Sequence, residues 1–114
     1  MIEIVFKPNI YELEITGHAG ADVKGKDIVC AAVSSLFYTL GQAVIESESM
    51  LMEAPVFEDE DGHGLIRCVP KAKYEGNISR SYWTILVGLQ MLAEQYPSNI
   101  SFKAEALNES KIEG

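Results

Sequence analysis

The chain has 114 residues, 47% of them hydrophobic and 23% charged, and its formal net charge is −8 at pH 7. This length suits a single domain with one core and excludes two ordinary domains. The acidic balance argues against direct binding to nucleic acid, which depends on lysine and arginine, and favours a basic protein or peptide as the partner. The sequence has no continuous run of about 18 apolar residues, the length that a membrane span needs, so we expect no membrane segment.

The first two predicted elements are β-strands. Residues 2–7 and 10–16 alternate between apolar and polar side chains, and the turn pair Pro8-Asn9 lies between them, as is typical of a β-hairpin. This alternation, with an early acidic residue, distinguishes the start of the chain from a signal peptide. The two cysteines lie in dissimilar contexts and predict free thiols. We therefore expect a cytoplasmic protein.

Residues 17–26 show no apolar periodicity and predict a flexible loop. The three glycines of this loop are Gly17, Gly20 and Gly25. Asp27 is a favourable N-cap, so we expect a helix that begins at Ile28 and ends near Glu46. Its apolar residues form two stripes, which predicts burial on more than one side, in the core or against a second subunit. The stripes are Ile28, Ala31, Leu36, Leu40 and Val44, and Val29, Val33 and Phe37.

The second half of the chain predicts a hairpin, a helix and a last strand. Residues 49–57 and 64–69 read as strands joined by an acidic run that ends in Asp61-Gly62, a strong hairpin signal. A helix follows over 78–95, capped by Asn77, with one apolar face, and residues 100–106 form the last strand.

The element order ββαββαβ predicts an α+β fold. We expect a two-layer sandwich in which a mainly antiparallel sheet carries two helices on one face. No internal repeat or linker divides the sequence, so residues 1–107 form one domain and the polar tail 108–114 frays.

Two residues of the first half point to nucleophilic chemistry. His18 lies in the glycine-punctuated stretch Gly17-His18-Ala19-Gly20, and Cys30 follows close to the expected helix start. With Asp27 as the N-cap, Cys30 falls in the first helical turn, where the helix dipole favours a thiolate and free backbone N–H groups offer an oxyanion hole. An imidazole beside this thiol would make it a nucleophile able to attack a peptide carbonyl.

Asp27 has two possible roles. Its carboxylate can cap the helix or orient the His18 ring, and both roles can coexist through its two oxygens. A carboxylate beside the sulfur would, however, disfavour the thiolate. We therefore expect Asp27 to be a supporting residue and not the third member of a triad.

Structural interpretations of the same residues stay open. Free cysteine often behaves as a small buried hydrophobe, and this alternative applies to Cys30. For Cys68, in an alternating strand, a core position is the expectation. His63 lies between two glycines of the predicted hairpin and is expected to have no chemical role.

Two further patterns are weaker. The stretch from Gly20 to Asp27 has the spacing of a phosphate-binding loop, but an aspartate replaces the required serine or threonine. A zinc site would need His18, Cys30, His63 and Cys68, which lack the short spacings of such sites. We therefore expect no cofactor and no metal.

The segment Gly17-His18-Ala19, followed by Gly25-Lys26-Asp27-Ile28-Val29-Cys30-Ala31-Ala32-Val33-Ser34, resembles the ribosomal-processing cysteine protease family, Prp. This resemblance implies a homodimeric endopeptidase with a Cys-His dyad, onto which Cys30 and His18 map. It implies removal of an N-terminal extension from a large-subunit ribosomal protein during ribosome assembly, by cleavage after an aromatic pair. The glycine-rich loop is then a flap over the substrate. The alternative is an acidic adaptor that binds a basic ribosomal protein without cutting it.

Overall fold

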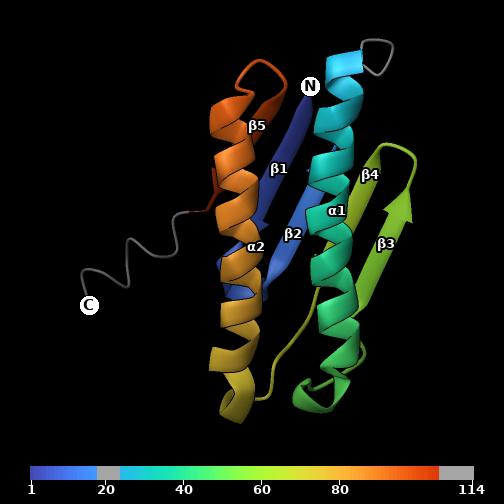
Figure 1. Cartoon of the computed structure of the whole chain (residues 1–114). Coiled ribbons are helices and arrows are strands. Elements are labelled where there is room, and N and C mark those ends of the chain that lie inside the picture. Colours follow the sequence, from blue (N-terminus) through green and yellow to red (C-terminus); the bar gives the residue numbers. More distant parts are fainter. Residues whose placement is uncertain (18–23, 106–114) are drawn as a thin grey trace, which may run out of the picture.

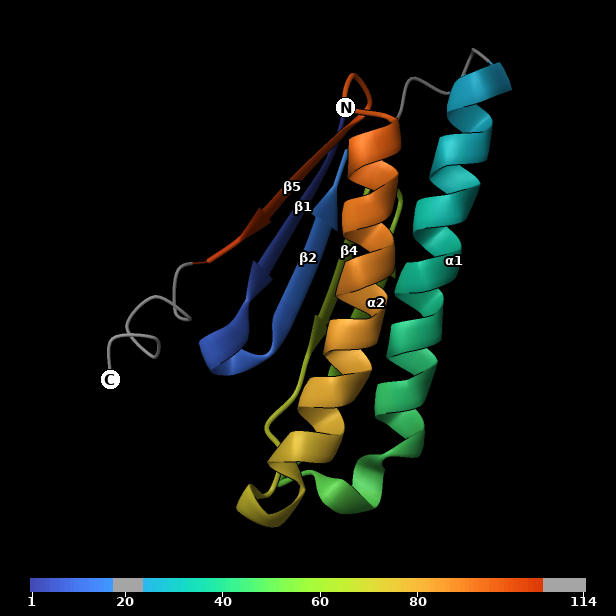
Figure 2. The same cartoon turned by 60° about the vertical axis from the view of Figure 1, so that its left-hand side comes forward.

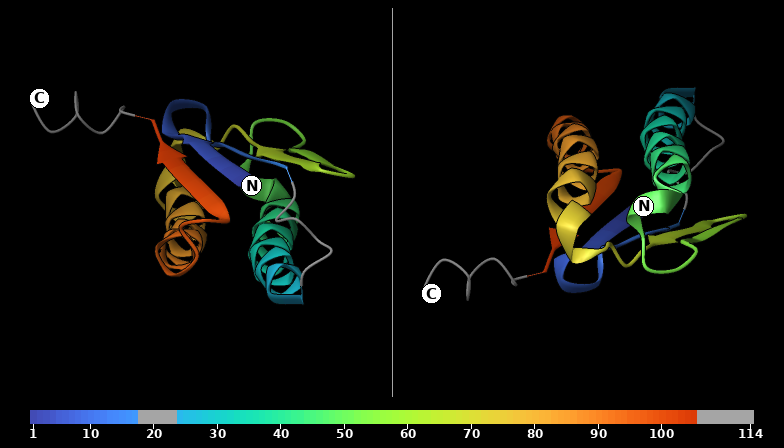
Figure 3. Two further views of the ribbon diagram at one scale, coloured as in Figure 1. Left: turned by 90° about the horizontal axis from the view of Figure 1, so that it is seen from above. Right: turned by 90° about the horizontal axis from the view of Figure 1, so that it is seen from below.

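The computed structural model describes residues 1–17 and 24–105, and for residues 24–27 it describes the backbone alone. The fold has two layers, with helices α1 (Lys24–Glu46) and α2 (Glu75–Gln95) on one face of a five-stranded sheet (Figure 1). Seen from either end, both helices lie on the same side of the sheet (Figure 3). The expected α+β class and the ββαββαβ order are confirmed.

The sheet is mixed and mainly antiparallel. Its strands are β1 (Ile2–Lys7), β2 (Glu12–Thr16), β3 (Val56–Glu60), β4 (His63–Arg67) and β5 (Ile100–Ala104), in the order β3-β4-β2-β1-β5. Among the described strands only the β1–β5 pair is parallel, with Ile2 opposite Ile100. The first and last of these strands therefore lie side by side, and β3 and β5 form the two edges of the sheet.

The core lies between the sheet and the helices. Alternate residues of β1 point toward the helices because successive side chains of a strand face opposite sides, and these residues are buried. The buried residues of the helices are Val29, Val33, Phe37, Leu40 and Val44 on α1, and Ile78, Tyr82, Ile85, Leu86 and Leu89 on α2. This apolar interface fixes how α1 is rotated about its own axis, and thus which side chains it presents elsewhere.

Helix α1 differs from the sequence-based expectation in two respects. It begins at Lys24, so Asp27 is its fourth residue and not its N-cap, and Gly25 belongs to the helix and not to the loop. Extending a long packed helix by one turn costs little once the helix is nucleated. The expected stripe containing Ile28 is also wrong at its N-terminal end, because Ile28 is 64% exposed while Val29 is buried.

Helix α1 is strongly apolar on average, although its sequence contains no continuous apolar run of membrane-spanning length. Ile28–Glu46 has a mean hydropathy of 1.8, and by length and composition alone this segment could cross a membrane. Core helices meet the same criterion. In this fold one stripe of α1 packs against the sheet in the common core, while other apolar residues of the helix, such as Ile28 and Ile45, are exposed.

Two other boundaries differ as well. Helix α2 begins at Glu75, after a 3-10 turn, and Asn77 lies inside it, so Asn77 is not its cap. The strand expected over 49–57 begins only at Val56, because Glu48–Met50 forms a 3-10 turn. Proline lacks the N–H that a strand ladder needs, and Pro55 directly precedes the strand. The Asp61-Gly62 turn was correctly predicted, and the acidic residues before it belong to β3.

Close packing of Phe37 against Gly64 gives a stability prediction. A Cβ built on Gly64 would lie 2.6 Å from the Phe37 ring, which is buried. We expect Gly64→Ala to lower the free energy of unfolding by about 1–3 kcal/mol through overpacking. Urea unfolding followed by circular dichroism measures this change.

Gly76→Ala is the matched control, because a Cβ there would have no neighbour within 4 Å. Since Gly76 lies in α2, its replacement by alanine should leave stability unchanged or raise it by up to about 1 kcal/mol. Equal effects of the two variants would contradict the packing argument.

Candidate active site

A cleft of about 390 Å³ lies between α1 and the strands that precede and follow it. One wall comes from α1 and includes Cys30, Ser34 and Tyr38. The opposite wall is the β3–β4 hairpin from Asp59 to Gly64, and the end of β2 contributes Gly17. Segments far apart in the sequence thus meet at this cleft.

Cys30 has a free, partly buried thiol, and it contacts the core while lining the cleft. Because α1 begins at Lys24, Cys30 is beyond the first helical turn, and the expected first-turn position is wrong. The dipole effect falls off within that turn. Only the first four N–H groups of a helix lack a helical acceptor, so the N–H of Cys30 is not free to form an oxyanion hole.

Gly17 holds the end of β2 at the cleft. Its N–H donates a hydrogen bond of 2.9 Å to the carbonyl of Gly62 in the hairpin turn. Its φ is +94°, and a Cβ at this position would lie 2.2 Å from the Met1 carbonyl oxygen. A glycine is therefore required here. His18, which follows Gly17 in the sequence, and Gly20 lie outside the described residues.

The hairpin wall of the cleft is acidic and is tied to α1. The Tyr38 hydroxyl donates a hydrogen bond to Asp59, and this bond to a carboxylate raises the pKa of Tyr38. Glu60 and Asp61 continue the same wall. A negatively charged wall beside a thiol favours positively charged ligands.

Ser34 and Tyr38 are site residues that sequence reasoning missed. Ser34 follows Cys30 by four residues on α1, and residues four apart lie on the same helix face. This spacing could have identified Ser34. Tyr38 depends on a contact with β3, for which the sequence has no local signal.

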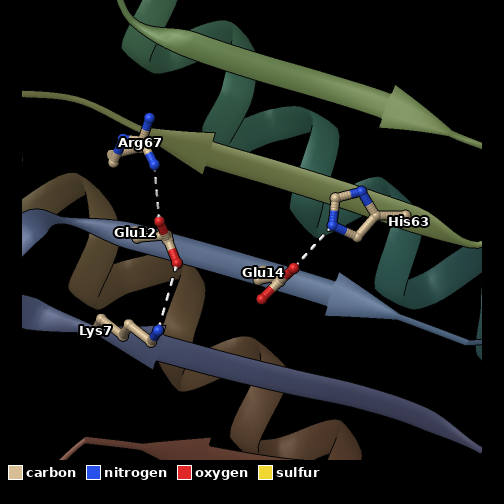
Figure 4. A network of polar contacts seen from close by, with 5 residues as sticks. All are labelled: Lys7, Glu12, Glu14, His63 and Arg67. Atoms are coloured by element: carbon tan, nitrogen blue, oxygen red, sulfur yellow. Dashed lines mark hydrogen bonds and ion pairs between the residues drawn. The ribbon is translucent and has the colours of Figure 1, made fainter.

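His63 does not belong with Cys30. It lies at the edge of the cleft, but its ring nitrogen is 2.8 Å from a Glu14 oxygen on the sheet face opposite the helices (Figure 4). On the same face, Glu12 bridges Lys7 and Arg67 (Figure 4). His63 thus contacts Glu14 across β2 and β4, beside the ion pairs that Glu12 forms with Lys7 and Arg67.

Cys68 is a core residue, as expected. It is 3% exposed, its sulfur lies 3.6 Å from the Tyr82 hydroxyl, and burial raises its pKa. Among residues 1–17 and 28–105, no three His, Cys, Asp or Glu side chains are arranged to hold a metal ion.

Comparison with known proteins identifies the family of this chain. The sequence model of the cysteine protease Prp family matches residues 1–101. The chain belongs to this family. The ribosomal processing cysteine protease Prp of Staphylococcus aureus (strain Mu50) is 32% identical over 93 residues, which cover 80% of this chain and 83% of that protein.

Solved structures of similar proteins share the fold. The S. aureus Prp in complex with a covalently linked product peptide is 27% identical, with a TM-score of 0.72, over 92% of this chain and 100% of that chain. SMU.848 from Streptococcus mutans is 28% identical, with a TM-score of 0.66, over 90% of each chain.

The two thiols should differ in reactivity. At pH 6 an ordinary thiol, with a pKa of about 8.5, is almost wholly protonated. We expect iodoacetamide to label Cys30 at least about tenfold faster than Cys68, because Cys68 is buried and its raised pKa disfavours the reactive thiolate. Peptide mass mapping over time measures both rates.

Cys30→Ser is the control and should leave only the slow labelling of Cys68. Equal and slow labelling of both cysteines in the unmodified chain would mean that Cys30 is not activated.

Proposed function

We propose that the protein is a cysteine endopeptidase with Cys30 as the nucleophile and His18 as the general base and acid. One structural observation supports this proposal most directly. The free Cys30 thiol lines a cleft to which Gly17, the residue before His18, also contributes. Membership of the Prp family supports the same chemistry.

The proposed reaction has two stages. His18 accepts the proton of the Cys30 thiol, the sulfur attacks the scissile carbonyl, and the imidazolium returns the proton to the leaving amine. A thioester then joins Cys30 to the acyl part of the substrate. Water, deprotonated by His18, attacks the thioester and regenerates the thiol.

Asp27 is the supporting residue in this proposal. It precedes Cys30 by three positions in α1, and residues three apart are neighbours on a helix surface. From there a carboxylate can orient the imidazole of His18. The segment between Gly17 and α1, which contains Gly20, is proposed as a flap that closes over the substrate, with Gly17 holding one end at β2 and Gly25 lying in the first turn of α1.

The proposed substrate is a large-subunit ribosomal protein, from which the enzyme removes an N-terminal extension during ribosome assembly. The S. aureus relative is described as a ribosomal processing protease, and one of its structures contains a substrate peptide. The acidic wall around Asp59 and the net charge of −8 suit a basic protein of this kind. Two free thiols suit a reducing compartment, the cytoplasm.

We also propose that two copies associate through the outer face of α1. From Ile28 to Ile45 this helix carries no charged residue, and both of these side chains are substantially exposed. Such an uncharged face suits contact with an identical face, since the rest of each chain is strongly acidic.

An acidic adaptor is the second candidate function. The same cleft wall could bind a basic ribosomal protein without cutting it. The protease needs the Cys30 thiol for cleavage, whereas the adaptor would bind the ribosomal protein without it.

Cleavage of the extended ribosomal protein tests the dyad. We expect Cys30→Ala and His18→Ala to lower kcat/KM by at least about a thousandfold, because each removes a group that the reaction uses directly. Asp27→Asn should lower kcat/KM by about tenfold, the scale of a supporting residue. Mass spectrometry of the products measures all three.

Cys68→Ala is the matched control and should keep normal cleavage if the variant folds. Undiminished cleavage by Cys30→Ala or His18→Ala would remove the dyad. Tight binding of the ribosomal protein with no cleavage by the unmodified chain would favour the adaptor.

Light scattering tests the dimer. At micromolar concentration the unmodified chain should have twice the monomer mass. Ile45→Glu places a charge on the proposed interface, at a position that does not line the cleft, and should shift the mass toward the monomer. Met52→Glu, at a 67% exposed position outside α1, should not. A monomer in every case would refute the dimer.

A further inference from the structure

A second and larger groove lies on the other helix. It has a volume of about 770 Å³ and runs between α2 and the C-terminal ends of β1 and β5. Figure 2 shows these two strands diverging from α2 toward those ends. None of the residues that line this groove, here called the α2 groove, lines the cleft of Cys30.

Aromatic side chains dominate the α2 groove. They are Phe6, Tyr11, Tyr82, Trp83 and Phe102. Tyr82 is fully buried and forms part of the base, whereas Trp83 is 63% exposed. Beside it on α2, Val87 is 40% exposed. An exposed tryptophan at the rim of an apolar groove is typical of a surface that binds a partner.

The charges of the α2 groove have one sign. Its lining contains Glu75 at the start of α2 and Glu105 after β5, and no lysine or arginine among the described residues. The Tyr11 hydroxyl donates a hydrogen bond of 3.0 Å to Glu75. Burial and this carboxylate raise the pKa of Tyr11 to about 12, so Tyr11 stays a neutral donor near pH 7.

Charge separates the possible occupants. The segment 106–114 of this chain contains Glu109, Lys111 and Glu113 and is acidic overall, and a second copy carries a net charge of −8. Both would bring like charge to Glu75 and Glu105. A lysine- or arginine-rich segment instead places its cationic groups against the two carboxylates and over the aromatic faces, while its aliphatic stems cover apolar surface.

We propose that the α2 groove is an exosite that binds a cationic segment of the protein substrate, remote from the bond that is cut. The identity of that substrate as a basic ribosomal protein rests on the function proposed above. Ile2 lines the cleft and Phe6 lines the groove, and these buried residues lie about 13 Å apart along β1. The core lies between the two hollows, so a substrate that fills both must pass around it, which a short peptide around the scissile bond cannot do.

Binding to the groove can be measured without proteolysis, because Trp83 is the one tryptophan of the chain. The probe is a blocked peptide, Lys-Phe-Lys-Leu-Lys, titrated into the Cys30→Ala variant while tryptophan emission is recorded. We expect a saturable change in emission with this probe and none with the matched peptide Glu-Phe-Glu-Leu-Glu. Equal responses to the two peptides, or no response to either, would overturn the proposal.

Charge-matched variants locate the site. Glu75→Gln and Glu105→Gln should each raise the Kd of the cationic probe by about threefold, the scale of one exposed charge pair. Glu58→Gln removes the same charge from an exposed position on β3 that does not line the groove, and should leave the Kd unchanged. Equal effects of all three variants would show attraction by net charge alone and refute a groove-specific site.

Kinetics test whether the groove serves the substrate. Trp83→Ala removes a largely exposed side chain, and it should raise KM for the full-length extended ribosomal protein by about fivefold without changing kcat/KM for a short peptide across the cleavage site. Equal losses on both substrates, or no loss on the full-length protein, would refute the exosite. Failure to cut either substrate would refute the proposed protease and leave the fluorescence result to decide on the groove.

Discussion

The packing of one stripe of α1 on the sheet is the constraint from which the rest of the molecule follows. Val29 and Val33 point into the core, and each residue of an α-helix is turned by about 100° from the one before it. Cys30 and Ser34 therefore lie at the margin of the buried stripe and face the cleft. The thiol is placed by the burial of its neighbours, and no polar contact of its own is needed to hold it there.

The same constraint divides the surface into regions of different character. The sheet face without helices carries the polar contacts of Glu12 and Glu14, and the outer face of α1 has no charged residue from Ile28 to Ile45. The two hollows occur where a helix meets the margin of the sheet, the cleft at α1 and the groove at α2. Acidic side chains border both. Apolar packing thus shapes these hollows, and charge selects what enters them.

The sequence predicted those features that depend on local periodicity. The alternation of β1, the buried face of α2, the turn at Asp61-Gly62 and the core position of Cys68 all follow from nearest neighbours along the chain. The start of α1 was predicted wrongly. Asp27 is a good cap by residue type, but the helix begins three residues before it, at Lys24. The early start also removes the dipole and the oxyanion hole that first-turn placement would have given Cys30.

Long-range contacts were beyond local patterns. The Tyr38 bond to Asp59 and the Gly17 bond to Gly62 join segments that only the folded sheet brings together. The pairing of His18 with Cys30 is a prediction from the sequence and from family resemblance, and it stays one. Likewise, the α2 groove combines residues from β1, α2 and β5, none of which forms a motif.

The parallel pairing of β1 with β5 affects how the chain folds during its synthesis. Because Ile2 lies opposite Ile100, the sheet cannot be completed until the residues of β5, Ile100–Ala104, have emerged from the ribosome. Until then β1 has one unsatisfied edge, and such non-local closure is slow. Completion of the sheet therefore depends on synthesis of β5. A nascent chain that stops before β5 would lack the strand that pairs with the open edge of β1.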